Sequence, residues 1–360
     1  MKNKKSFRDL LLKWHREENK RTMPWKGEKD AYKVWVSEII LQQTRVDQGW
    51  SYYEKFIDQY PTVTHLANAK DEAVFKLWEG LGYYTRCKNL LHTARIINEK
   101  YAGKFPSDYN AILDLKGIGG YTASAIASFC FDLPYAVVDG NVLRILSRYF
   151  GIDLPVDSTV GKKCFTRLAH DCLDKDQPGE YNQSIMDFGA TICKPLPLCK
   201  KCLLNKQCVA FNSGRITELP VKQKSIIKKE RWFSYFIFSF NNKTFVQERT
   251  AKDIWQNLHE FYLEETTLDP EWNAEKIKKW LHRQLNIKKA KSINIIPAKK
   301  QLLTHQVING YFLHIELNTQ PPILSKPTGS WLNNAELNKK AFPQFIHQFI
   351  GGKALQLQVL

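Results

Sequence analysis

Four cysteines packed into sixteen residues constrain this chain more than any other feature of its sequence. Their spacing is Cys193-x5-Cys199-x2-Cys202-x5-Cys208. In a cytosolic chain, thiols this close together indicate a bound metal centre and not disulfide bonds. Four cysteines suit either a zinc ion or a [4Fe–4S] cluster. The spacing is looser than the paired C-x2-C knuckles of structural zinc sites, which favours iron–sulfur.

A second constraint is the glycine-rich stretch at residues 115–144, LKGIGGYTASAIASFCFDLPYAVVDGNVLR. Gly117, Gly119 and Gly120 remove side chains where a backbone turns, and a helix of small apolar residues follows them. The free N–H groups at such a helix start suit a phosphate. A plain tight turn between two helices is the alternative, and the glycines alone do not decide between the two.

The charge of the chain points to a polyanionic partner. Lys and Arg number 53 against 36 Asp and Glu, which gives a formal net charge of +17. Nucleic acid is the first candidate and an anionic membrane surface the second. No apolar run approaches the ~20 residues of a membrane span, and the basic N-terminus is too quickly interrupted by charges to be a signal peptide. We therefore expect a cytosolic protein.

The pattern of apolar residues changes near residue 231. Residues 6–212 have mostly helical periodicity, and strand signals are few before residue 231. A polar, basic stretch with Gly214 and Pro220 separates this region from alternating segments such as WFSYFIFSF, KTFVQER and YFLHIEL. The sequence predicts a helical region of residues 1–212, a linker of residues 213–230 and an α+β domain of residues 231–360.

Glu38 is a candidate general acid. It stands in VWVSEIIL, which is apolar on nearly every side, and a carboxyl group without water tends to keep its proton. Asp139 is a candidate anion, since it follows an apolar run and precedes a helix beside the glycine hairpin. The plainer alternatives are a surface glutamate and a helix N-cap. One neutral and one charged carboxyl group would suit the cleavage of a glycosidic bond.

A further glycine turn, WEGLGYYTR at residues 78–86, carries adjacent tyrosines. Flat rings on an exposed loop beside basic residues suit stacking on bases or wedging between them. Packing against a neighbouring helix is the alternative.

Together these segments resemble the helix-hairpin-helix DNA glycosylases, and most closely the MutY-type adenine DNA glycosylases. The resemblance covers nearly all of residues 10–210. It rests on MPWK, VWVSEIILQQTRV, PTVTHLANA, LWEGLGYYTRCKNL, GKFP, LKGIGGYTASAI, VVDGNVLRIL, YNQSIMDFGATIC and the cysteine cluster.

The resemblance implies roles for individual residues. Glu38 matches the acid that protonates adenine at N7, and Asp139 matches the carboxylate that stabilises or traps the sugar cation. Tyr121 and Asn141 match residues that support this step, and the four cluster cysteines match the [4Fe–4S] ligands. The residues that match DNA or base contacts are Lys26, Gln42, Gln43, Thr44, Leu81, Tyr83, Gly117, Gly119, Gln183, Thr304 and His305.

The resemblance also implies the architecture. We expect an all-α glycosylase core, with a six-helix barrel at about residues 30–135 that carries the hairpin 115–123. An iron–sulfur module comes from about residues 8–29 and 136–212, and residues 231–360 form a Nudix-like domain that reads 8-oxoguanine. We expect a monomer in the bacterial cytoplasm, associated with the nucleoid, whose partner is duplex DNA with A:8-oxoguanine or A:G mispairs.

One difference from the lyases of the superfamily and two departures from the MutY-type pattern matter. Lyases of the superfamily carry a Schiff-base lysine where this chain has Tyr121, so we expect a monofunctional hydrolase. Leu303 replaces an aromatic residue in the loop that reads the lesion, and the first cysteine gap is five residues instead of six. Two rival functions remain, a bifunctional glycosylase/AP lyase and a non-catalytic iron–sulfur DNA-binding protein. No clustered glutamates of a Nudix box are present, so we do not expect pyrophosphatase activity.

Overall fold

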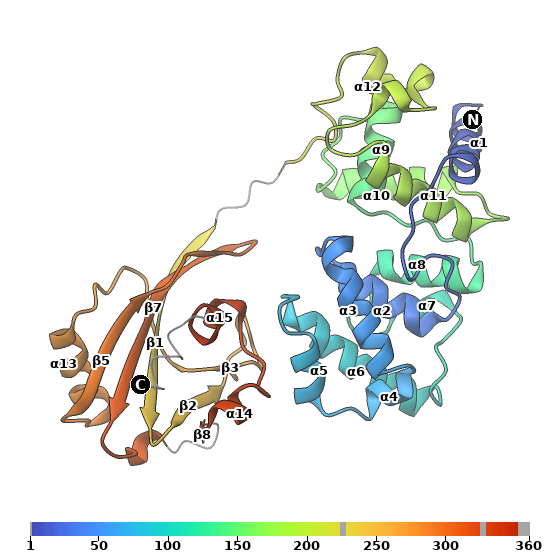
Figure 1. The fold of residues 1–360 in the computed structure, drawn as a ribbon. Helices are drawn as coiled ribbons and strands as arrows, with labels where there is room; N and C mark the ends of the chain where they lie inside the picture. The colour runs from blue at the N-terminus through green and yellow to red at the C-terminus, as the bar shows by residue number, and fades with distance from the viewer. Residues whose placement is uncertain (1, 224–227, 325–328, 352–360) are drawn as a thin grey trace. The chain divides into compact units, whose positions relative to one another are not determined.

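The computed structural model describes residues 2–223, 228–324 and 329–351 (Figure 1). The chain divides into two compact units. One consists of residues 1–69 and 88–225, and the other of residues 70–87 and 226–360. None of the helices in the described part of the chain has the length and apolarity that a membrane crossing demands.

The chain is helical up to residue 212, as the apolar periodicity predicts. Within the described residues no strand precedes Lys229. The elements are α1 (Lys2–Glu17), α2 (Ala31–Leu41), α3 (Val46–Gln59), α4 (Val63–Ala67), α5 (Asp71–Leu77), α6 (Tyr84–Lys100), α7 (Tyr109–Leu113), α8 (Gly120–Phe131), α9 (Gly140–Phe150), α10 (Thr159–Cys172), α11 (Pro178–Thr191), the short 3-10 turns Cys199–Lys201 and Asn205–Gln207, and α12 (Val209–Asn212).

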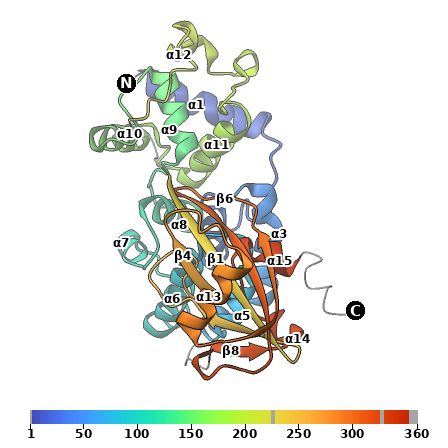
Figure 2. The ribbon, with the colours of Figure 1, turned by 90° about the vertical axis from the view of Figure 1, so that its left-hand side faces the viewer.

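The N-terminal helix packs against helices that lie far from it in sequence. Phe7, Leu11 and Trp14 of α1 are buried with the apolar faces of α9, α10 and α11 in one core (Figures 1 and 2). The ring of Trp14 meets Phe188 of α11 edge to face, with centroids 4.9 Å apart. The segment of residues 18–30, which contains neither helix nor strand, therefore starts from a fixed helix and runs to α2.

Part of the predicted linker of residues 213–230 is held on the helical unit. Leu219 is buried and its carbonyl oxygen accepts a hydrogen bond from Arg148 Nε at 3.0 Å. The N–H of Val156 donates to Val221 O at 3.0 Å, and that of Gln223 to Asp157 Oδ1 at 2.9 Å. The polar composition of this stretch does not predict these contacts, because most of them are made by backbone atoms. Residues 224–227 lie outside the described residues, and the first strand begins at Lys229.

The second unit is built on a mixed sheet. Its elements are β1 (Lys229–Phe240), β2 (Lys243–Glu248), β3 (His259–Glu260), β4 (Tyr262–Thr266), α13 (Ala274–Leu285), β5 (Ala290–Pro297), β6 (Gln301–Leu302), β7 (Gln306–Leu317), a 3-10 turn at Pro322–Leu324, β8 (Gly329–Leu332), α14 (Asn334–Leu337) and α15 (Gln344–Ile350). The main strand order is β3-β2-β1-β7-β5, and β1 runs parallel to β7. Asn241 and Asn242 both have positive φ, 47° and 57°, as a tight hairpin turn between β1 and β2 demands.

Alternate residues of β1 point to opposite sides of the sheet, and both sets are buried. Phe233, Tyr235 and Ile237 join a core with α15, while Phe236 and Phe238 join one with α13. Figure 1 shows α13 and α15 on opposite faces of the sheet. The sequence prediction of a C-terminal α+β domain is confirmed.

Residues 70–87 belong to the second unit through ionic and backbone contacts. Glu79 accepts hydrogen bonds from Phe342 N at 2.8 Å and from His347 Nε2 at 2.9 Å. Lys340 Nζ lies 2.7 Å from Glu72 Oε1. The glycine turn of residues 78–83 is thereby attached to the end of the C-terminal region, a grouping that the sequence does not predict.

Candidate active site

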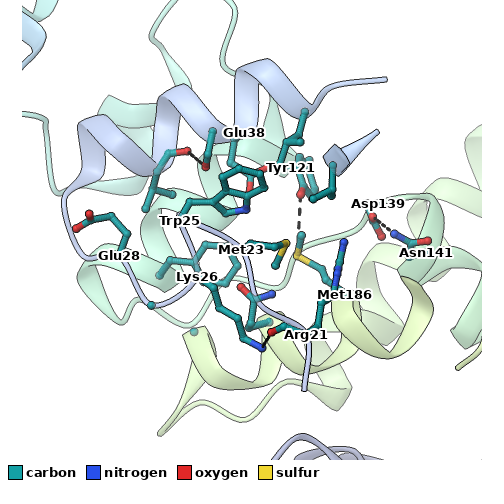
Figure 3. A pocket seen from close by; sticks show the side chains of 18 of the residues that line it. Arg21, Met23, Trp25, Lys26, Glu28, Glu38, Tyr121, Asp139, Asn141 and Met186 are labelled. Carbon is teal, nitrogen blue, oxygen red and sulfur yellow. Dashed lines mark hydrogen bonds between the residues drawn. The ribbon is translucent and has the colours of Figure 1, made fainter. Parts of the chain in front are cut away.

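A cavity of about 690 Å³ opens in the helical unit (Figure 3). Its walls come from His15 of α1, from residues 21–29, from α2 and residues 42–46 after it, and from α8, α9 and α11. Many of the predicted site residues contribute polar groups to its lining, namely Lys26, Glu38, Gln42, Gln43, Thr44, Tyr121, Asp139, Asn141 and Gln183.

Glu38 reaches this cavity from the most apolar helix of the unit. Its side chain is 6% exposed, and its neighbours in α2 are buried on every side of the helix. The pKa of the Glu38 carboxyl is raised to about 7: burial raises it most, the hydrogen bond with Tyr121 lowers it, and the nearby charge of Asp139 raises it. The pKa of Glu38 therefore lies where a proton donor at neutral pH needs it.

Tyr121 stands at the start of α8 and links two sides of the cavity. Its side chain hydrogen-bonds with the carboxyl group of Glu38, and its hydroxyl lies 4.0 Å from Met186 Sδ (Figure 3). Burial, followed by the charges of Glu38 and Asp139, raises the pKa of Tyr121 well above its usual range. The phenol thus keeps its proton and fixes one oxygen of Glu38, which leaves the other oxygen for a ligand.

Asp139 is held by a different arrangement. It is the N-cap of α9, and its Oδ1 accepts a hydrogen bond from Val142 N at 2.7 Å. Its Oδ2 accepts one from Asn141 Nδ2 at 2.9 Å (Figure 3). Burial raises the pKa of Asp139 above its ordinary value, while these hydrogen bonds and the charge of Arg144 act in the opposite direction. Because these contacts favour the ionised form, Asp139 is the better placed of the two carboxyl groups to carry the charge.

Arg144 holds the side chain of Asn141 in place. Its Oδ1 accepts a hydrogen bond from Arg144 Nη2 at 2.7 Å. Arg144 also donates to the carbonyl oxygens of Gly189 and Cys193, each at 2.8 Å. A Cβ added at Gly189 would lie 2.6 Å from the Cβ of Asn141, so only glycine allows α11 to approach α9 this closely.

A charged residue that the sequence analysis did not assign, Asp187, lies behind the cavity lining and binds two cations that line the cavity. Asp187 of α11 is fully buried and lies 2.8 Å from Arg21 Nη1 and 3.0 Å from Lys26 Nζ. Lys26 Nζ also donates to Arg21 O at 2.8 Å. Trp25 and Met186 also line the cavity. The available signal was helical spacing, because Gln183, Met186 and Asp187 share one face of α11.

The glycine hairpin has the geometry that the sequence predicts. Gly117 has a φ of +82°, and a Cβ there would lie 2.7 Å from the Cβ of Asn89. Gly119 is the N-cap of α8, and a Cβ built on it meets no atom within 4 Å. The first N–H groups of α8 are therefore approachable by an anion.

The predicted wedge and the predicted lesion reader meet in the second unit. Tyr83 is 44% exposed, has a φ of 48°, and shares a hydrogen bond between its hydroxyl and that of Thr304. His305 is exposed, and its carbonyl oxygen accepts a hydrogen bond from Lys229 N at 3.0 Å. Leu81 differs from these residues because its side chain is buried.

All four cluster cysteines line one small cavity, together with Arg148, Ile192 and Phe211. Arg148 Nη1 lies 3.8 Å from Cys193 Sγ and binds the carbonyl oxygen of Lys194 at 2.9 Å. Within the described residues, no three His, Cys, Asp or Glu side chains close on a single metal-ion position. The four thiols nevertheless lie close enough to one another to be candidate ligands of a shared metal centre.

Two family descriptions match the chain. Residues 36–165 match the HhH-GPD superfamily base excision DNA repair proteins, and residues 234–351 match the NUDIX domain. Among solved structures, a thermostable thymine-DNA glycosylase is 29% identical and aligns with a TM-score of 0.55 over 59% of this chain and 98% of its own. A trapped endonuclease III–DNA intermediate shares the fold at 18% identity and a TM-score of 0.51 over 59% of this chain and 98% of its own.

Curated relatives extend the match to the full length. The adenine DNA glycosylase of Buchnera aphidicola subsp. Schizaphis graminum is 33% identical over 361 residues, which span 96% of this chain and 97% of the relative. That of Buchnera aphidicola subsp. Acyrthosiphon pisum is 36% identical over 86% and 85%, and that of Mus musculus is 40% identical over 60% and 44%. The chain therefore belongs to the adenine DNA glycosylases of base excision repair, with a helical HhH-GPD region followed by a NUDIX domain.

Proposed function

We propose that this adenine DNA glycosylase removes adenine mispaired with 8-oxoguanine or guanine from duplex DNA, by hydrolysis alone. The observation that carries the proposal is the pair of carboxyl groups in one cavity. Glu38 is buried and its pKa is raised to about 7, and Asp139 accepts hydrogen bonds from a helix N-terminus and an amide. The net charge of +17 supports binding to the DNA backbone.

The two groups divide the reaction between them. Protonated Glu38 gives its proton to N7 of the extruded adenine, and the electron pair of the glycosidic bond leaves with the base. The sugar becomes an oxocarbenium ion, which the negative charge of Asp139 stabilises. Water then adds to the sugar and its proton returns to the Glu38 carboxylate, so that atoms and charge balance.

The residue at position 121 supports a hydrolase. A lyase of this superfamily needs an amine that forms a Schiff base with the sugar, and this chain has the phenol of Tyr121 beside Glu38. The pKa of Tyr121 is raised well above its usual range by burial, so the phenol stays a neutral hydrogen-bond donor. We therefore favour a monofunctional enzyme over the bifunctional glycosylase/AP lyase.

The contact between Tyr83 and Thr304 supports recognition of the oxidised base. 8-Oxoguanine differs from guanine by a donor at N7 and an acceptor at O8, and a hydroxyl can serve as partner to either. Because Tyr83 belongs to the turn expected to enter the base stack, Thr304 would lie beside the base opposite the adenine. His305 is a second polar group on this exposed loop.

We assign the [4Fe–4S] cluster to Cys193, Cys199, Cys202 and Cys208, which line a common cavity. When bound, it would cross-link the loop that follows α11. The carbonyl oxygens of Cys193, Lys194 and Pro195 accept hydrogen bonds from Arg144 and Arg148, which tie this loop to α9.

The first prediction concerns the two carboxyl groups. Glu38→Gln and Asp139→Asn each lower single-turnover adenine release from an A:8-oxoguanine duplex by at least about a hundredfold, because one removes the acid and the other the anion. Binding of the mispaired duplex, measured by fluorescence anisotropy, stays within about threefold of wild type. Wild-type release falls as pH rises through about 7, where Glu38 loses its proton.

The matched controls are Glu99→Gln and Asp58→Asn, which change exposed residues of the same unit. They keep wild-type release. Full activity in Glu38→Gln or Asp139→Asn contradicts the assigned roles, and borohydride trapping of the wild-type enzyme on DNA favours the lyase.

The second prediction concerns lesion recognition. Thr304→Val keeps the shape of the side chain but removes the hydroxyl, so we expect the preference for A:8-oxoguanine over A:G to fall about tenfold, the value of one good hydrogen bond. The comparison uses single-turnover rates on both duplexes. Thr267→Val, the same change at an exposed position, is the control and leaves the preference unchanged. An unchanged preference in Thr304→Val shows that this hydroxyl does not read the lesion.

The third prediction concerns the metal centre. The purified protein contains about four irons and four sulfides per chain, as a [4Fe–4S] cluster demands. Cys202→Ser lowers the iron content and the melting temperature, whereas Cys164→Ser, outside the cysteine cavity, changes neither. A colourless protein that holds one zinc ion would refute the assignment.

A further inference from the structure

Asp187 lies behind the cavity lining, bound to the lining residues Arg21, Lys26 and Gln183, and has no exposed surface. Four donors surround its carboxylate. Arg21 Nη1 and Gln183 Nε2 donate to Oδ1 at 2.8 and 3.0 Å. Asn19 Nδ2 donates to Oδ2 at 2.8 Å, and Lys26 Nζ lies 3.0 Å from the same oxygen. Two of these four donors, Arg21 and Lys26, are cations.

A carboxylate has acceptors only, about two for each oxygen. The four donors therefore use its full capacity. The amide of Gln183 must turn its nitrogen toward Asp187, because its carbonyl oxygen in that place would face another acceptor at hydrogen-bond distance. The amide orientation is thus set by the chemistry of its partner.

This orientation decides what Gln183 presents to the cavity that it lines. With the nitrogen bound to Asp187, the carbonyl oxygen Oε1 is the end available to a ligand. No described residue hydrogen-bonds with this oxygen. Adenine carries an amino group at C6, which donates hydrogen bonds, whereas guanine carries an oxygen there, which accepts them. An amide with its oxygen toward the base selects the amino group.

We propose that Asp187 is a positioning residue that fixes the Gln183 amide with its oxygen toward the base, so that the cavity selects a purine with a 6-amino group. The inference rests on the proposed function, since it assumes that the extruded base enters this cavity. Asp187 acts through Gln183 and does not touch the base. Its bonds to Arg21 and Lys26 hold the same wall in place from the other side.

The test compares two duplexes with 8-oxoguanine opposite either adenine or unsubstituted purine, which lacks the 6-amino group. The readout is the ratio of the two single-turnover rates, because a general loss of catalysis cancels in the ratio. Asp187→Asn replaces two acceptors by one acceptor and one donor, so it no longer dictates the orientation of Gln183. We expect the adenine-to-purine ratio to fall about tenfold.

A double-mutant cycle shows whether Asp187 acts through the amide. Gln183→Met alone lowers the ratio by a similar factor, and adding Asp187→Asn to it lowers the ratio no further. Asp187→Glu keeps both acceptors and retains the wild-type ratio. The control is Asp171→Asn, which removes an exposed carboxylate that binds Lys4 at 2.8 Å, and it leaves the ratio unchanged.

Thermal melting confirms that each variant is folded at the assay temperature. A folded Asp187→Asn with the wild-type ratio overturns the inference, as does a further loss of the ratio in the double variant. If Asp187→Asn does not fold, the other two variants test the inference. A wild-type adenine-to-purine ratio in Gln183→Met overturns the inference, and so does a lowered ratio in Asp187→Glu. If the wild type releases neither base, the proposed function itself fails.

Discussion

The burial of one carboxyl group, that of Glu38, sets the requirements for the rest of the site. A charged carboxylate in an apolar helix would lose its hydration without a compensating cation, so the neutral form is favoured. The residues around Glu38 in α2 leave it only the phenol of Tyr121 as a hydrogen-bond partner among the groups that shift its pKa. The protein thereby keeps a proton in the cavity at a pH where free glutamate has lost it.

A site that stores a proton on one carboxyl group needs a second one with the opposite preference. Hydrogen bonds from the N-terminus of α9 and from Asn141 favour the ionised form of Asp139. Two cations that line the cavity, Arg21 and Lys26, pair with Asp187 behind the lining. Glu38, Asp139 and Asp187 thus have different partners. Glu38 and Asp139 can therefore take different roles although both are carboxyl groups.

Much of this site follows from the sequence, because its key residues stand in patterns with a local cause. A few neighbouring residues are enough to recognise each of these patterns: the apolar run around Glu38, the N-cap at Asp139 and the spacing of the cysteines. Asp187 was missed because its donors Asn19, Arg21 and Lys26 come from a segment some 160 residues earlier in the chain.

The fold shows the same division between local and distant causes. The helical region and the strands were predicted from periodicity, whereas two long-range groupings were not. The attachment of residues 70–87 to the C-terminal unit depends on Glu79 and His347, which are 268 residues apart. The hydrogen bonds that hold Leu219 and Val221 use backbone atoms, which composition does not reveal.

The central claim, that folding keeps Glu38 protonated, is tested most directly by the stability of the wild type and of Glu38→Gln as a function of pH. A carboxyl group whose pKa is about 7 when folded and 4.5 when unfolded stabilises the protein least at high pH. We expect the free energy of unfolding of Glu38→Gln, relative to wild type, to rise by about 3 kcal/mol between pH 4.5 and pH 8 in urea titrations. A difference that stays constant over this range would contradict the account.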